Sequence, residues 1–99
     1  IDIDALPFLP HAAALAQQGY VTGASHRNWS SYGDGVVLPA DCPDWRRHLL
    51  TDPQTSGGLL VSCLPEAASD LLATMVADGC VQARIIGHVE QGPPVVRAA

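Results

Sequence analysis

The sequence predicts a mixed α/β (α+β) fold, a sheet with packed helices, from three observations. Short apolar runs of strand length alternate with stretches of helical apolar spacing. Glycine, proline and polar residues stand between these elements, as turns require. An apolar fraction of 47% with 15% charged residues in 99 residues is ordinary for one domain with a single modest core.

The first twenty residues predict a strand and a helix. Residues 1–5 alternate apolar and acidic side chains, the period of a half-buried strand. Residues 11–18 follow with a narrow apolar face of small residues. We expect Pro10 to be the first helical residue and Gly19 to lie just past the helix end.

The next thirty residues predict a loop, a strand and a brief helix. Residues 21–35 are rich in glycine, serine and asparagine without a clear period, which indicates a structured loop. Residues 36–39 are apolar and short, as a strand would be. Asp44 is a residue type that caps helices, so we expect it to cap a helix that runs through Leu50.

The centre of the chain contains the clearest strand and the clearest helix of the sequence. Residues 52–58 form a polar loop that leads into the apolar run at residues 59–64. Pro65 then opens a helix over residues 66–78, with apolar residues at helical spacing and Gly79 at its end.

The last part of the chain predicts two extended segments. Residues 83–89 read as another strand, and residues 95–96 as a final extended piece. These two segments are candidates for a hairpin, although the Pro93–Pro94 pair limits pairing at its base.

The charge balance excludes several functions. Ten acidic residues face five basic ones, a formal net charge of −5, whereas a nucleic-acid site needs a basic face. All five basic residues are arginine, so the chain has no phosphate-loop, Schiff-base or general-base lysine. No apolar run is long enough to span a membrane. The chain opens at Ile1 without a signal peptide, which we interpret as the start of an excised fragment.

The cysteines indicate neither a disulfide framework nor a metal clip. Cys42, Cys63 and Cys80 are odd in number and widely spaced, so a reducing cytoplasm is the expected location. No pair of cysteines and histidines has the spacing of a metal site; the histidines are His11, His26, His48 and His88. We expect small apolar cysteines in or near the core.

Two polar loops contain the candidate site residues. In the first, Arg27 can bind an anion through two N–H groups, and Asn28 can fix a polar ligand edge. The alternative is structural: Arg27 would satisfy backbone carbonyls, while Trp29 and Tyr32 would hold the loop on the core.

The second loop is a weak phosphate signal when taken alone. Its hydroxyls and glycine backbone N–H groups can form an anion nest; they belong to Thr55, Ser56, Gly57 and Gly58. Asp52, which precedes a proline, can make a turn with its own backbone. However, this loop precedes a strand rather than opening a helix, and no lysine completes it.

Together the loops resemble the selenophosphate synthetase (selenide, water dikinase) family. The resemblance rests on GASHRNWSSYG, followed by LLTDPQTSGGLLVSC, of which DPQTSGG is the most specific part. ALPFLP and VTGAS near the start, the tryptophan before LLTDPQTSGG and ARIIGHV near the end extend it over nearly the whole chain.

The resemblance implies an enzyme that makes selenophosphate from selenide, ATP and water, releasing AMP and phosphate. It implies the fold of the aminoimidazole ribonucleotide synthetase-like superfamily, with residues 1–99 as part of the C-terminal domain, truncated at its N-terminal side. In the family an N-terminal domain holds the reactive cysteine or selenocysteine, the catalytic lysine, most magnesium-binding aspartates, most of the ATP site and the dimer interface. This chain would then hold no catalytic or metal residue, bind no cofactor alone and be inactive alone.

The fragment would supply one wall of the interdomain cleft. The expected cleft residues are Arg27, Asn28, Thr55, Ser56, Gly57 and Gly58. Two alternatives remain open at this point. One is a non-catalytic nucleotide-binding or regulatory module. The other is the C-terminal domain of a related ATP-dependent synthetase or kinase, such as the aminoimidazole ribonucleotide or thiamine-phosphate enzymes.

Overall fold

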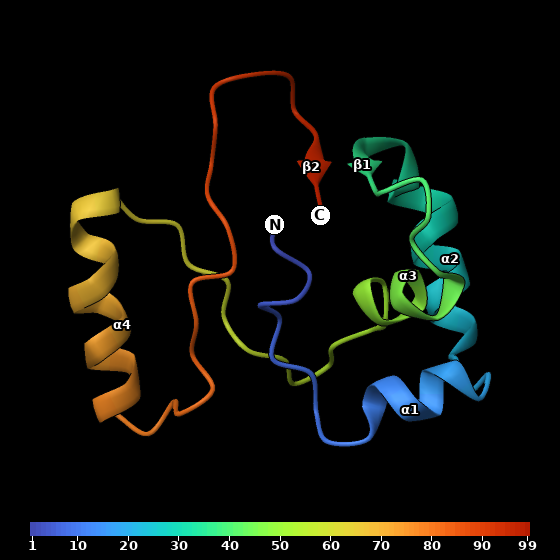
Figure 1. The fold of residues 1–99 in the computed structure, drawn as a ribbon, viewed down its shortest axis with the longest axis horizontal. Coiled ribbons are helices and arrows are strands. Elements are labelled where there is room, and N and C mark those ends of the chain that lie inside the picture. The colour runs from blue at the N-terminus through green and yellow to red at the C-terminus, as the bar shows by residue number, and fades with distance from the viewer.

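The computed structural model describes all residues, Ile1–Ala99, and has the predicted mixed α/β character. Its elements are α1 (Ala12–Gln17), α2 (Gly23–Tyr32), η1 (Gly33–Gly35), β1 (Val36–Val37), α3 (Asp44–Leu50), η2 (Pro65–Ala67), α4 (Ala68–Ala77) and β2 (Val96–Arg97). Helices α1, α2 and α3 gather beside the short sheet, whereas α4 stands apart at the other end of two long irregular segments (Figure 1).

The sheet consists of two parallel strands from distant parts of the chain. Val36 of β1 lies opposite Val96 of β2, and the Ala98 N–H donates to the Val37 carbonyl at 3.0 Å. The predicted hairpin between residues 83–89 and 95–96 is therefore wrong, because β2 pairs with β1 instead.

The first three residues extend this pairing on the other side of β2. The amino group of Ile1 donates to the Arg97 carbonyl at 2.6 Å, and the Ala99 N–H donates to the Ile1 carbonyl at 2.9 Å. The Ile3 N–H returns to the Ala99 carbonyl at 2.8 Å. This alternation is the hydrogen-bond pattern of a parallel ladder, and Ile3, which makes its last bond, is buried.

A turn ends that ladder early, which corrects the strand predicted over residues 1–5. The Asp2 carboxylate accepts hydrogen bonds from the N–H groups of Asp4 and Ala5 at 3.0 and 3.2 Å. Such a side-chain turn bends the backbone away from an extended path. On its outer side, the Asp2 N–H donates to the Ile86 carbonyl at 2.8 Å.

The three predicted helices are confirmed, with corrections at their starts. Helix α1 begins at Ala12, so Pro10 lies before the helix and not in its first turn. Pro43, not Asp44, is at the N-cap of α3, and Asp44 stands in the first turn, where its charge favours the helix dipole. Gly19 and Gly79 follow α1 and α4 with φ of 90° and 96°, the left-handed conformation that ends helices.

The loop predicted over residues 21–35 is wrong, because residues 23–32 form helix α2. Its composition has low helix propensity, so local preference does not explain it. The Thr22 hydroxyl caps the helix by accepting from the Ser25 N–H at 3.1 Å. Packing against α3 supplies the remaining stabilisation, as is usual for short helices.

The strands predicted at residues 59–64 and 83–89 are absent. Residues 53–63 make no backbone hydrogen bond within the chain, and residues 83–89 have only the bond from Asp2 to Ile86 and one turn bond at Ala83. A β-strand forms only where a neighbouring strand offers its N–H and C=O groups. Both segments have the apolar pattern of a strand, but no other strand of this chain lies beside them to pair with.

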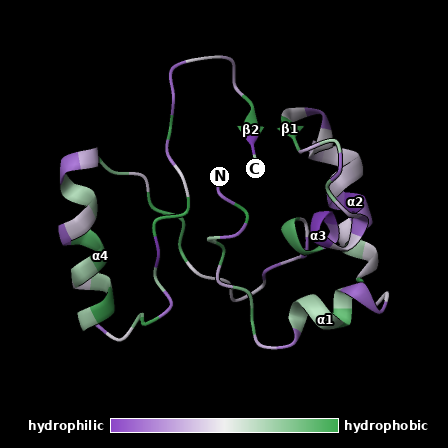
Figure 2. Ribbon diagram, viewed as in Figure 1, coloured by the Kyte–Doolittle hydropathy of each residue, from purple (hydrophilic) through white to green (hydrophobic).

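Little of the chain is buried, although a single modest core was expected. Only Ile3, Ala16, Ser25 and Ala98 are buried. The accessible surface is 7612 Å², whereas a compact monomer of 10.4 kDa exposes about 5,400 Å². Apolar residues along α4 and the two connecting segments account for part of this surface (Figure 2).

We predict that the contact between residues 1–3 and the segment at residues 83–89 is sensitive to one methyl group. A Cβ at Gly87 would lie 3.0 Å from the Ile1 Cα, so Gly87→Ala must push two backbones apart. Urea denaturation should show a loss of about 1–3 kcal/mol in the free energy of unfolding. Gly92→Ala, which meets nothing within 4 Å, is the control; equal effects of both changes would contradict the contact.

Candidate functional site

The α2–α3 junction is the best-defined polar feature of the molecule. Ser25, on the first turn of α2, is fully buried, and its hydroxyl donates to the His48 carbonyl at 2.7 Å. The Ser25 oxygen also lies 2.7 Å from the Thr51 hydroxyl. Either hydroxyl can donate in this second contact, because the Thr51 hydroxyl also has the Arg47 carbonyl as an acceptor at 3.0 Å.

Two further side chains join α2 to the start of the second polar loop. The Asn28 amide donates to the Thr51 carbonyl at 2.8 Å. The Thr22 hydroxyl donates to the Asp52 carboxylate at 3.1 Å. The Asp52 carboxylate therefore bonds to the cap of α2. The expected turn is not formed, since this carboxylate accepts no hydrogen bond from residues 54–58. The loop at residues 53–58 leaves from this fixed junction.

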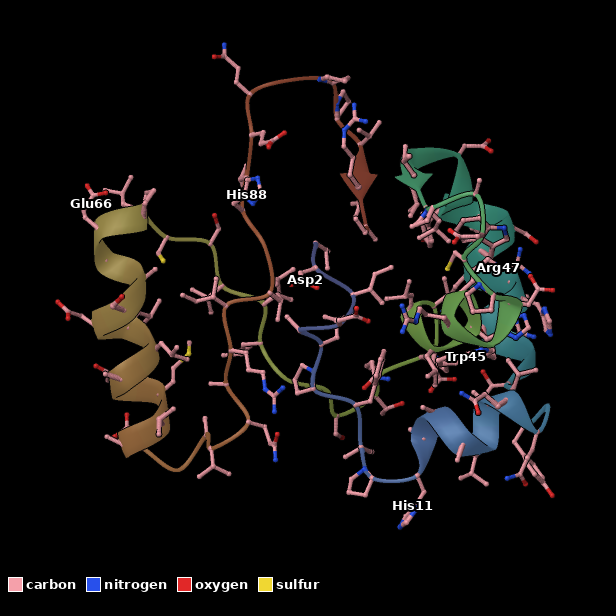
Figure 3. The ribbon with its side chains drawn as sticks, in the orientation of Figure 1. Asp2, His11, Trp45, Arg47, Glu66 and His88 are labelled. Carbon is pink, nitrogen blue, oxygen red and sulfur yellow. The ribbon has the colours of Figure 1, made fainter.

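Aromatic and cationic side chains line the same junction. The Arg47 guanidinium lies 5.3 Å from the Trp29 ring centre and also pairs with the Asp44 carboxylate at 3.1 Å. Arg47 and Trp45 project from α3 in Figure 3. A Cβ at Gly33 would meet the Trp29 ring at 3.0 Å, so this glycine lets the chain turn closely over the indole. Trp29 thus packs as the structural alternative expected, whereas Tyr32 is 74% exposed and does not hold the segment on the core.

Arg27 lies on the outer surface of α2. Its side chain is exposed and forms no ion pair or hydrogen bond, in contrast to Arg46, which pairs with Asp4 at 3.0 Å. The expectation that Arg27 satisfies backbone carbonyls is not met. A free guanidinium is a donor for a carboxylate or phosphate.

The second loop is also free of partners. Its residues are exposed and make no hydrogen bond, through backbone or side chain, to the rest of the chain; they are Thr55, Ser56, Gly57 and Gly58. A Cβ at Gly57 would come within 2.8 Å of the Gln54 Cβ, so the loop turns too tightly for another residue there. No hydrogen bond or ion pair joins this loop to Arg27.

The predicted site residues are not brought together into a cavity: Asn28 belongs to the junction, whereas Arg27 and residues 55–58 make no bond to it. One groove, of about 300 Å³, lies between the segment before α1 and the end of α3; its lining includes Leu6, Phe8, Leu49 and Asp52. A second, about 230 Å³, is mostly apolar and lies over the sheet beside Trp29. Neither groove contains Arg27, Asn28 or the residues at 55–58.

The chain has hydrogen-bond donors that suit an anion but no group of metal ligands. No cluster of three or more histidine, cysteine, aspartate or glutamate residues exists that could hold a metal ion.

Cys42 is half-buried and Cys63 and Cys80 are exposed, which corrects the expectation that the cysteines lie in or near the core. No helix is long and apolar enough to cross a membrane.

Sequence reasoning missed the residues that build the junction. Thr22, Ser25 and Thr51 were part of polar stretches without an assigned role. The threonine three residues before Ser25 is a helix-capping signal, and it was the available indication that a helix starts there. The pairing of α2 with α3 depends on contacts 23 to 30 residues apart, which no local pattern shows.

Comparison with known proteins places the chain among enzymes that are dikinases by name. No protein-family model matches it. A selenide, water dikinase from Rhizobium meliloti strain 1021 is 53% identical over 95 residues, which are 96% of this chain and 27% of that protein. One from Paraburkholderia xenovorans strain LB400 is 54% identical over 87 residues (88% and 25%), and one from Pseudomonas straminea is 50% identical over 96 residues (97% and 27%).

Identity at this level over almost the whole chain shows that it is similar to a segment of proteins that are kinase-type enzymes by name. The chain is homologous to a segment of the selenide, water dikinases, so the resemblance to selenophosphate synthetases is confirmed. It spans about a quarter of the length of the relatives that it matches.

We predict that the Ser25 hydroxyl holds the α2–α3 junction. Ser25→Ala removes the 2.7 Å bond to the part-buried His48 carbonyl, which costs about 1–3 kcal/mol. Chemical denaturation followed by circular dichroism should show this loss. Ser31→Ala on the same helix, at an exposed serine without a side-chain hydrogen bond, should change stability by less than about 0.5 kcal/mol. A Ser25→Ala protein as stable as the Ser31→Ala protein would contradict this role.

Proposed function

We propose that this chain is part of an ATP-dependent enzyme that makes selenophosphate from selenide, ATP and water, with release of AMP and phosphate. The observation that carries the proposal is its identity of about half to the selenide, water dikinases over nearly its whole length. In this proposal, residues 1–99 are part of a C-terminal domain of the aminoimidazole ribonucleotide synthetase-like superfamily.

The missing part of the enzyme supplies the chemistry in this proposal. An N-terminal domain would hold the reactive cysteine or selenocysteine, the catalytic lysine, most of the ATP site and the dimer interface. Magnesium would be bound there as well. The working enzyme would be a cytoplasmic homodimer.

This chain would contribute one wall of the cleft between the two domains. Arg27 supports this role because its guanidinium is exposed and has no partner in the chain. The loop of Thr55, Ser56, Gly57 and Gly58 supports it because its N–H and hydroxyl groups are exposed and unpaired. Free donors of both kinds suit the oxygens of a phosphate chain.

The junction described above would give this wall its rigidity. Thr22 and Asn28 fix the backbone at Thr51 and Asp52, directly before the loop. Hydrogen-bond donors that are already fixed in position can stabilise the negative charge that develops in a transition state, because no free energy is spent on ordering them first. Asn28 would then act through Thr51, with its amide oxygen left for a ligand edge. ATP, when bound, supplies the transferred phosphoryl group; Arg27 and the loop N–H groups would neutralise its oxygens.

We predict that Arg27 matters for activity and not for folding. The test places this chain in the Rhizobium meliloti relative, in exchange for the 95 matched residues, and follows selenophosphate and AMP formation. Arg27→Gln should lower the rate at least about tenfold, because one charged donor to a phosphate is lost. Thr55→Ala should lower it in the same direction.

The control is Arg84→Gln, at an exposed arginine whose one contact is a 3.4 Å bond to Gln82. Both arginine variants should keep the melting temperature of the parent chimera. Loss of stability in step with loss of activity would assign Arg27 a structural role. An unchanged rate in Arg27→Gln would remove it from the site, and a chimera inactive while folded would contradict the proposed function.

A further inference from the structure

The segment at residues 59–64 has an unpaired backbone. Within residues 53–63 no N–H donates to, and no C=O accepts from, any other backbone group of the chain. Backbone polar groups in folded proteins are paired almost without exception once they leave water. Here they are instead exposed, on a run of six residues, LLVSCL, that contains no charge.

The side chains of this segment are exposed on both of its faces. Leu59 and Leu60 are 92% and 77% exposed, and Val61 and Leu64 are 45% and 66% exposed. In an extended chain successive side chains point to opposite faces, so both faces are apolar. A strand that is apolar on both faces is typical of the interior of a sheet covered by helices, not of a sheet edge in water.

The amount of uncovered surface indicates a large covering structure. The chain exposes 7612 Å², about 2,200 Å² more than a compact protein of its mass. A standard protein–protein interface covers about 800 Å² per partner. The excess is therefore on the scale of a missing part of a domain core, and a small or transient contact would not cover it.

We propose that residues 59–64 form a β-strand that pairs with strands from the polypeptide outside this chain, in the longer enzyme of which the chain is a quarter. This inference rests on the proposed function for the existence of that longer polypeptide. Helix α4, which follows through η2 and has no buried residue, would cover one face of the completed strand. The same polypeptide would cover the other.

A second copy of the chain is the less favoured occupant. A strand in the same polypeptide is present at an effective concentration of the order of millimolar, well above that of a free second copy. The net charge of −5 also opposes close approach of two copies. The experiment below therefore tests both partners: the longer polypeptide and a second copy of the chain.

The test compares amide hydrogen exchange at residues 59–64 in the isolated chain and in the folded chimera with the Rhizobium meliloti enzyme. We expect fast exchange in the isolated chain at every protein concentration and at least about a hundredfold slower exchange in the chimera. The full-length relative, measured at its corresponding residues, serves if the chimera does not fold. Fast exchange in the longer protein would overturn the inference, as would protection in the isolated chain that rises with concentration and so indicates a second copy.

A pair of matched variants tests the side chains. Leu60→Asp should destabilise the chimera and leave the isolated chain unchanged, because Leu60 would be covered only in the longer protein. Leu9→Asp, at a leucine of similar exposure (79%), should affect both proteins equally. Equal effects of Leu60→Asp in both proteins would overturn the inference. Enzymatic activity of the chimera is measured separately. Slow exchange without activity would support the strand and contradict the proposed function. Activity with fast exchange would support the proposed function and contradict the strand.

Discussion

The buried hydroxyl of Ser25 is the interaction on which the ordered half of the molecule depends. Ser25 is the one polar residue that the chain buries, and its hydroxyl meets the end of α3 through the His48 carbonyl and Thr51. With α2 fixed, Trp29 lies against Arg47, and the chain leaves η1 directly into β1. β1 then pairs with β2, and β2 with residues 1–3, so the sheet follows from the helix junction.

What the sequence predicted correctly depended on local signals. The apolar spacing before Gly19 and Gly79 located α1 and α4, and the end of α3 at Leu50 was predicted correctly, with its cap misplaced by one residue. Helix α2 was missed because serine, glycine and asparagine favour loops, while the bonds that stabilise it come from α3. The strands at residues 59–64 and 83–89 were predicted from apolar patterns that are real, but pairing is not a local property.

The candidate site shows the same division. Composition and resemblance identified Arg27 and the loop at residues 55–58, and both are exposed and free of partners. The backbone directly before that loop is held by Thr22 and Asn28. Thr22 could be identified from the sequence only as a helix cap, and its bond to Asp52 is visible only in the structure. In the proposed function, these free donors would face a ligand that another domain holds.

The central claim is that this chain carries part of a domain core and leaves the rest for a longer polypeptide to complete. The dependence of unfolding free energy on urea concentration measures it directly, because that slope scales with the surface exposed on unfolding. From its surface of 7612 Å², the isolated chain should give about three quarters of the slope of a compact protein of its size. A slope equal to that of a compact 99-residue domain would contradict the account, since it would mean that the chain closes its own core.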